Sequence, residues 1–147
     1  MRGIIHVLLT SAISLGLLGC APAPPDEEQI RGLLEDMTLA LEEREASRVL
    51  APLADDFVGE TWDLDVRALR MILRREMLAH ERLKARLFDI EVDLLSTDRA
   101  RVDFQVLLTG GSGLVPSEGR WFDVETGWRE DGDWELISAR WENVIGR

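Results

Sequence analysis

Apolar residues recur at helical spacing in the first half of the chain. From Asp26 onward, a stripe with i, i+3 and i+4 spacing predicts an amphipathic helix with one buried face, made of Ile30, Leu33, Leu34, Met37 and Leu41. A shorter helical segment follows at residues 47–53. Asp63 or Asp65 is expected to begin a third helix, with an inner face of Leu69, Ile72, Leu73, Met77 and His80.

After Lys84 the period of the apolar residues changes from 3.6 to 2. Alternating apolar and polar positions predict four half-buried antiparallel strands. Their inner faces are Phe88, Ile90, Val92 and Leu94, then Val102, Phe104, Val106 and Leu108, then Phe122, Val124 and Trp128, then Trp134 and Leu136. A short extended segment at residues 55–60 precedes the third helix.

The side-chain period fixes the registers of the two hairpins, because a slip of one residue would turn the apolar positions outward. A three-residue loop at 96–98 sets Asp93 opposite Arg101. In the last hairpin the loop is expected at 130–132, with Gly132 in the left-handed conformation. That register pairs Trp128 with Trp134 on the inner face and Arg129 with Asp133 on the outer face.

Charge and cysteine content exclude several classes of function. The chain has 28 acidic and 17 basic residues, a net charge of −11, so nucleic acid is not expected as a partner. Cys20 is the only cysteine, which excludes an intramolecular disulfide and a cysteine-based zinc site. His80 would be the only histidine left after removal of an N-terminal signal, which argues against a multi-histidine metal centre. No metal or cofactor is expected.

The N-terminus has the features of a signal peptide. Arg2 precedes an apolar run at residues 4–18, which as a helix would span about 22 Å and is too short to cross a bilayer. The sequence Leu17-Leu18-Gly19-Cys20 resembles the bacterial lipobox. The alternative is a general secretory signal followed by an incidental cysteine.

The lipobox resemblance implies cleavage after residues 1–19 and acylation of Cys20. Residues 20–25 then form a short proline-rich linker between the lipid and the domain. In such lipoproteins, Ala21 in place of an aspartate implies transport to the outer membrane. The implied location is the periplasmic side of that membrane in a Gram-negative bacterium, where acylated Cys20 would anchor the protein in the lipid bilayer.

Residues 26–147 resemble the nuclear transport factor 2-like (SnoaL-like) superfamily. The resemblance lies in helices followed by a long antiparallel meander, in residues 53–58 (LADDFV) and in residues 131–138 (DGDWELIS). It implies an α+β, cystatin-like fold in which N-terminal helices pack in a curved antiparallel sheet that forms a cone. Members include enzymes, carrier domains and interaction modules, so function is left open.

Catalysis in the cone is disfavoured. Enzymes of this superfamily such as ketosteroid isomerase use a cone-lining aspartate with a tyrosine donor, and this chain has no tyrosine. By parity, the inner strand face holds no carboxylate over residues 88–108 or 120–140, unless a bulge reverses the alternation. We therefore identify no catalytic residue from the sequence.

Five residues are candidates for a ligand site at the mouth of the cone. His80 falls on the apolar helix face; the alternative is a neutral core or helix-end histidine. Arg120 and Arg140 share the inner parity and, with Ser138 and Trp62, could bind an anionic group. The alternative is that these arginines pair with a carboxylate such as Glu60 or Glu76, because a buried unpaired charge is costly.

Trp121 and Trp141 are predicted to face each other on the outer side of the sheet. Exposed paired tryptophans are typical of an interface, and family members often dimerise through the sheet. Burial beneath the loop at 110–113, or a bulge, is the alternative.

The sequence thus predicts a membrane-anchored envelope lipoprotein. Its domain is expected to be non-catalytic and to bind either a small anionic or amphipathic ligand or a protein, including a second copy of the chain. The alternative is a SnoaL-like isomerase, dehydratase or hydrolase acting in the cone.

Overall fold

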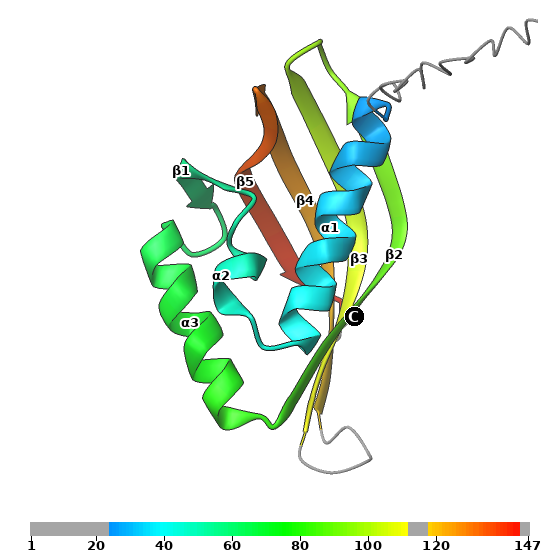
Figure 1. Cartoon of the computed structure of the whole chain (residues 1–147). Coiled ribbons are helices and arrows are strands. Elements are labelled where there is room, and N and C mark those ends of the chain that lie inside the picture. The colour runs from blue at the N-terminus through cyan, green and yellow to red at the C-terminus, as the bar shows by residue number, and fades with distance from the viewer. Residues whose placement is uncertain (1–23, 112–117, 145–147) are drawn as a thin grey trace, which may run out of the picture.

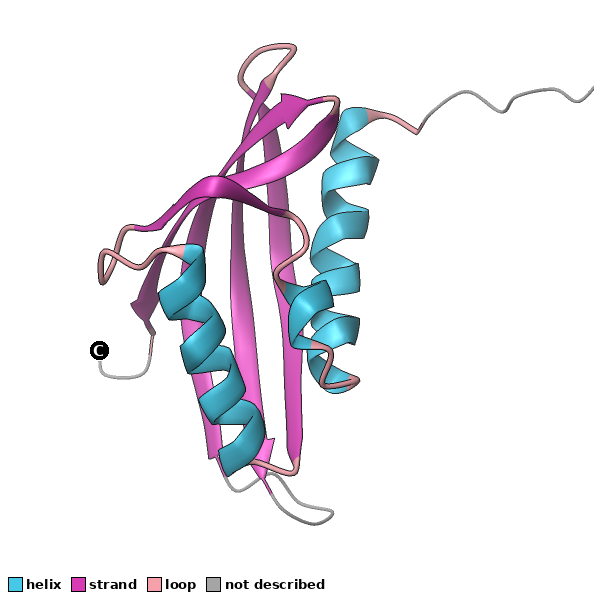
Figure 2. Ribbon diagram, turned by 60° about the vertical axis from the view of Figure 1, so that its left-hand side comes forward, coloured by secondary structure: helices cyan, strands magenta, loops and turns pink. Residues whose placement is uncertain are grey.

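The computed structural model describes residues 24–111 and 118–144 and shows an α+β fold. Three helices lie against one face of a curved five-stranded sheet (Figures 1 and 2). The elements in chain order are α1 (Asp26–Glu42), α2 (Ala46–Val49), β1 (Leu53–Gly59), α3 (Val66–Ala79), β2 (Arg82–Leu94), β3 (Arg99–Gly111), β4 (Glu118–Asp131) and β5 (Asp133–Asn143). The expected fold class is confirmed.

The strand order is β1-β5-β4-β3-β2, and β2 to β5 form the predicted antiparallel meander. The sequence did not predict the pairing of β1, which runs parallel to β5 with Leu53 opposite Leu136 and Val58 opposite Ser138. Parallel pairing requires a long crossover. Here the crossover consists of α3 and strands β2 to β4, so the pairing of β1 with β5 depends on the tertiary fold.

The core lies between α1 and the middle of the sheet. Ile30 on α1, Val102 on β3 and Trp128 on β4 are completely buried. The indole Nε1–H of Trp128 donates to Thr126 Oγ1 at 2.9 Å, and the Thr126 hydroxyl donates to the Val102 carbonyl at 3.1 Å. The one buried polar side chain in the described part of the core is therefore hydrogen-bonded on both sides.

The first hairpin has the predicted register, but β2 contains a bulge. Asp93 lies opposite Arg101, with a guanidinium-to-carboxylate distance of 2.6 Å. Asp89 has a φ of 52°, in the left-handed region, and the register shifts between Phe88 and Glu91. The prediction that Phe88 faces inward is wrong, because the bulge leaves it on the outer face.

The last hairpin also contains a bulge, and two predicted pairings are wrong. The turn is tighter than predicted, with Asp131 opposite Asp133, so Trp128 lies opposite Leu136 instead of Trp134. The register then shifts between Gly127 and Trp128. Arg129 lies opposite Glu135 instead of Asp133. Gly132 does have the expected left-handed conformation, with a φ of 83°.

Arg129 connects β1 to the meander. Its guanidinium donates to both carboxylate oxygens of Asp56 at 2.9 Å and also contacts Glu135 at 3.2 Å. The hydrogen bonds from Arg129 lower the pKa of Asp56, because they stabilise the ionised carboxylate. This bidentate pair attaches the edge strand β1 to β4. Strand β1 then continues through Val58 and Gly59 into the turn that precedes α3.

Helix α3 begins as predicted. The Asp65 carboxylate caps it by accepting the Ala68 backbone N–H at 2.7 Å. Met77 is buried and Leu69 and Leu73 are half-buried. The prediction that Ile72 is an inner residue is wrong, since 36% of it is exposed. The helix lies beside β1 and α2, and it covers the inner face of the sheet only near the β1 edge (Figure 2).

Candidate functional site

The inner face of the sheet is packed at one end and partly open at the other. Toward the β2–β3 hairpin, Ala100, Val102 and Trp128 are buried against α1. Toward the other end, apolar inner residues keep solvent exposure, and 38% of Leu108 is exposed. We call this open part the apolar inner surface; it consists of Leu87, Leu108, Phe122, Val124 and Trp141.

The apolar inner surface is open because α1 and α3 cover different parts of the sheet. The backbone of α1 lies closest to β2 and its inner side chains share the core with Val102 and Trp128, whereas α3 contacts β1 at the opposite edge. Among the described residues, the backbone of α3 lies close to β1 and α2 and not to β3 or β4. The inner face between these two helices is therefore covered less completely than the core around Trp128.

His80 lies at the lower end of this surface, where α3 passes into β2. It is the C-cap of α3, and its side chain is 18% exposed. Its Nε2 lies 3.6 Å from Glu76 Oε2, and its ring packs on Gly110, where an added Cβ would lie 3.0 Å from Nδ1. The position is that of a helix-end histidine, which the sequence left as an alternative.

The structure does not bring Arg120 and Arg140 together. Arg120 lies opposite Leu108 on the inner side and is exposed. Arg140 lies opposite Glu125 on the outer side, because the bulge in the last hairpin reverses the parity of β5. The predicted shared anionic rim is therefore wrong.

Arg140 instead pairs with carboxylates. Its Nη2 lies 2.7 Å from Glu60, and its Nη1 lies 3.9 Å from Glu125. The hydrogen bonds that Arg140 donates to Glu60, and the negative charges of Glu60 and Glu125, raise the pKa of Arg140. The pairing with Glu60 that the sequence left as an alternative is thus confirmed.

Ser138 and Trp62 also lie apart from Arg120. Ser138 is on the outer side beside Gly127, where its Oγ would lie 2.6 Å from an added Cβ. Trp62 is 63% exposed in the turn before α3 and makes an edge-to-face contact with Trp141, with ring centroids 5.3 Å apart. Trp62 thus extends the rim of the apolar inner surface.

The predicted pair of outward-facing tryptophans is wrong. Trp141 is on the inner side, where it lies opposite Val124 and packs over Gly59. Trp121 is on the outer side, with its ring centroid 5.0 Å from that of Phe88. Trp121 is therefore on the predicted side, and the bulge in the last hairpin, which was the alternative, accounts for the inward position of Trp141.

The outer face carries a different feature, an acidic hollow of about 380 Å³. Its lining residues are Asp89, Asp103, Phe104, Gln105, Asp123, Val124, Glu125, Arg140 and Glu142. Arg101 and Arg140 contact some of these carboxylates. Among the described residues no group of histidine, cysteine and carboxylate side chains is arranged to hold a metal ion.

The sequence analysis did not predict that Glu76 is the carboxylate next to His80. The two residues are four apart, a spacing that places side chains on the same face of a helix. The spacing is visible in the sequence, which by itself also allows Glu76 to pair with an arginine.

The predicted acylation of Cys20 and most of the predicted linker concern residues outside the described part of the chain. The described residues begin at Pro24. Within the described residues, no helix is both long enough and apolar enough to cross a bilayer.

Comparison with known proteins gives matches in structure alone. No protein-family model matches the chain, and no curated protein matches it. A nuclear transport factor 2-like protein with a cystatin-like fold from Novosphingobium aromaticivorans superposes with a TM-score of 0.69 at 14% identity. The match covers 83% of this chain and 84% of that one.

Two further similar structures have names that denote enzymes. One is a putative scytalone dehydratase from N. aromaticivorans, with a TM-score of 0.68, 14% identity, and coverage of 81% of this chain and 84% of that one. The other is a hexachlorocyclohexane dehydrochlorinase from Novosphingobium barchaimii, with a TM-score of 0.66, 12% identity, and coverage of 81% and 86%. At these identities the likeness shows the fold, which is nuclear transport factor 2-like and cystatin-like.

Proposed function

We propose that this protein is an outer-membrane lipoprotein of a Gram-negative cell envelope, anchored by acylated Cys20 on the periplasmic side. Leu17-Leu18-Gly19-Cys20 supports the anchor. So does the position of α1, which begins at Asp26, so that six residues (20–25) separate the lipid from the domain. A linker of that length spans about 20 Å when extended and keeps the domain close to the bilayer.

The proposed role of the domain is to bind a small amphipathic ligand on the apolar inner surface. The observation that carries this proposal is the exposure of inner apolar side chains, such as 38% of Leu108, on a sheet whose other half is tightly packed. A ligand that covered these side chains would gain about 25 cal/mol per Å² of buried apolar area. Arg120, on the same side, suits a ligand with an anionic end.

Binding can be tested with 1-anilinonaphthalene-8-sulfonate, an anionic amphipathic probe, and the chain from Asp26 onward. We expect one saturable site, and Leu108→Glu should weaken binding by at least ~10-fold, or about 1.4 kcal/mol, because it places a carboxylate on the apolar inner surface. Leu95→Glu is the matched control: Leu95 is 63% exposed in the β2–β3 turn at the other end of the sheet. Equal affinities for both variants would argue against this site.

His80 supports a second candidate function, proton abstraction from a ligand held on the same surface. A histidine oriented by a carboxylate is a common general base, and Glu76 lies 3.6 Å from His80. Two of the structural neighbours are named for eliminations, which require loss of a proton.

Elimination can be tested directly with γ-hexachlorocyclohexane, by measuring chloride release. If this candidate is correct, the wild-type protein releases chloride and His80→Gln slows release by about 10²-fold or more. Glu76→Gln should give a smaller loss, since Glu76 acts only through His80. Chloride release that is unchanged in His80→Gln would rule out His80 as the base.

A further inference from the structure

The solvent face of α3 combines exposed apolar side chains with arginines. Leu78 is 88% exposed, the highest value among the large hydrophobic residues described, and Met71 is 67% exposed. At 100° per residue, Met71 and Leu78 fall on the side of the helix occupied by Arg67 and Arg74, with Arg70 and Arg75 flanking them. We call these six residues the α3 face.

The arginines of the α3 face are not neutralised within the described structure. Arg67, Arg70 and Arg74 have no carboxylate within 4.0 Å, and Arg75 only approaches Glu76, at 3.8 Å. Several other described arginines form close ion pairs, as Arg48 does with Asp36 and Arg140 does with Glu60. Positive charge is also concentrated in this part of the sequence. Residues 66–86 contain seven Lys or Arg and two Glu, whereas the chain as a whole has a net charge of −11.

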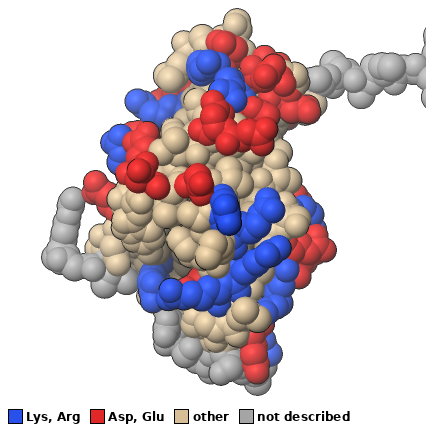
Figure 3. All heavy atoms as spheres, turned by 90° about the vertical axis from the view of Figure 1, so that its left-hand side faces the viewer, with Lys and Arg blue, Asp and Glu red and all other residues tan. Residues whose placement is uncertain are grey.

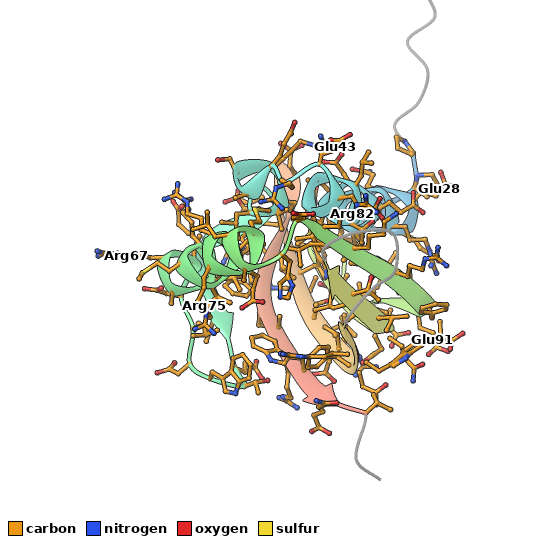
Figure 4. All side chains as sticks on the ribbon, turned by 90° about the horizontal axis from the view of Figure 1, so that it is seen from below. Glu28, Glu43, Arg67, Arg75, Arg82 and Glu91 are labelled. Carbon is orange, nitrogen blue, oxygen red and sulfur yellow. The ribbon has the colours of Figure 1, made fainter. Side chains whose placement is uncertain are left out.

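The surface views show this segregation directly. Lys and Arg gather over the lower half of the face that α3 occupies, with uncharged surface between them, and Asp and Glu gather at the upper end (Figure 3). Seen from below, Arg67 and Arg75 point away from the rest of the molecule (Figure 4). The α3 face therefore offers a positive, partly apolar surface to an outside partner.

The stability of the fold does not explain the α3 face. The inner residues Leu69, Leu73 and Met77 already attach α3 to the domain. Arg67 lies in the first turn of the helix, where the helix dipole disfavours a cation, and no acidic residue lies in that turn. Arg70 and Arg74 are a like-charged i, i+4 pair, which destabilises a helix slightly.

We propose that the α3 face binds an acidic segment of a partner protein that also carries apolar side chains. Carboxylates complement the unneutralised arginines, and the apolar side chains cover Met71 and Leu78. Arg and Met are enriched in the cores of protein interfaces, and Arg is among the residues that contribute most to binding energy.

The observations favour a protein over a bilayer as the partner. The chain enters α1 at the upper end of the domain, whereas α3 lies at the lower end (Figure 1). With the anchor proposed above, on which this step rests, the tether joins the domain at the end opposite to α3. Outside residues 66–86 the chain is strongly acidic, so an anionic lipid surface would repel most of the molecule, while a short acidic segment can contact the α3 face alone.

The test uses the full chain in phosphatidylcholine nanodiscs and a labelled amphipathic peptide of about fifteen Glu and Leu residues, followed by fluorescence anisotropy. Arg67→Glu with Arg70→Glu should weaken binding by at least ~100-fold, and Met71→Ala with Leu78→Ala by about 10-fold. Arg31→Glu with Arg99→Glu is the matched control, because it makes the same change in net charge at arginines that are paired in the structure. Thermal unfolding by circular dichroism establishes that each variant is folded.

Three outcomes would overturn the proposal. The first is that the peptide does not bind. The second is that the Arg67/Arg70 double substitution and the Arg31/Arg99 double substitution weaken peptide binding equally. The third is that polyglutamate binds as tightly as the peptide, which would show that apolar side chains contribute nothing to binding. A fourth outcome would assign the α3 face to lipid instead: protection of α3 amides from hydrogen exchange in phosphatidylglycerol nanodiscs but not in phosphatidylcholine nanodiscs, without the peptide.

Discussion

Trp128→Ala is expected to lower the free energy of unfolding by about 3–5 kcal/mol, as measured by urea denaturation. Trp128 is completely buried between α1 and the sheet, so truncation leaves a large cavity that the surrounding strands cannot fill. It also removes the indole donor from Thr126. Because small domains have about 5–15 kcal/mol of stability, this change can unfold a large part of the population at 37 °C.

Trp62→Ala is the matched control for this prediction. It removes the same side chain from a position that is 63% exposed, where the main contact is the edge of Trp141. The expected loss is about 1 kcal/mol or less. Losses of similar size in the two variants would show that the core is not centred on Trp128.

Cys20→Ser is expected to move the protein from the membrane fraction to the soluble fraction and to abolish labelling by a fatty-acid analogue. Each buried CH₂ of an acyl chain contributes about 0.8 kcal/mol, so several chains anchor a protein stably on a bilayer. No described helix can replace that anchor, and serine has no thiol to acylate. The measurement is fractionation of cells expressing each variant, together with metabolic labelling.

Ala21→Ser, which changes the next residue and leaves the thiol in place, is the control for the anchor. It should retain both label and membrane association. If wild-type protein proves soluble and unlabelled, or if Cys20→Ser still takes up label, the anchor at Cys20 is disproved. The fold and the apolar inner surface do not depend on that result.

The sequence determined the helices, the four-stranded meander and the register of the first hairpin. Each follows from local physics: side-chain periodicity identifies the buried faces, and the pairing of Asp93 with Arg101 depends only on loop length and charge. The cap at Asp65 and the left-handed Gly132 are equally local. These features needed no knowledge of the rest of the chain.

The tertiary structure decided the parallel pairing of β1 with β5 and the two bulges, and the bulges in turn placed the candidate site residues. A bulge adds one residue to a strand and reverses the facing of all those beyond it. Asp89 can adopt its left-handed conformation without glycine, and neither it nor the shift near Trp128 has a sequence marker. Packing of the whole sheet against α1 and β1 selects these positions, so periodicity alone placed Arg140 and Trp141 on the wrong faces.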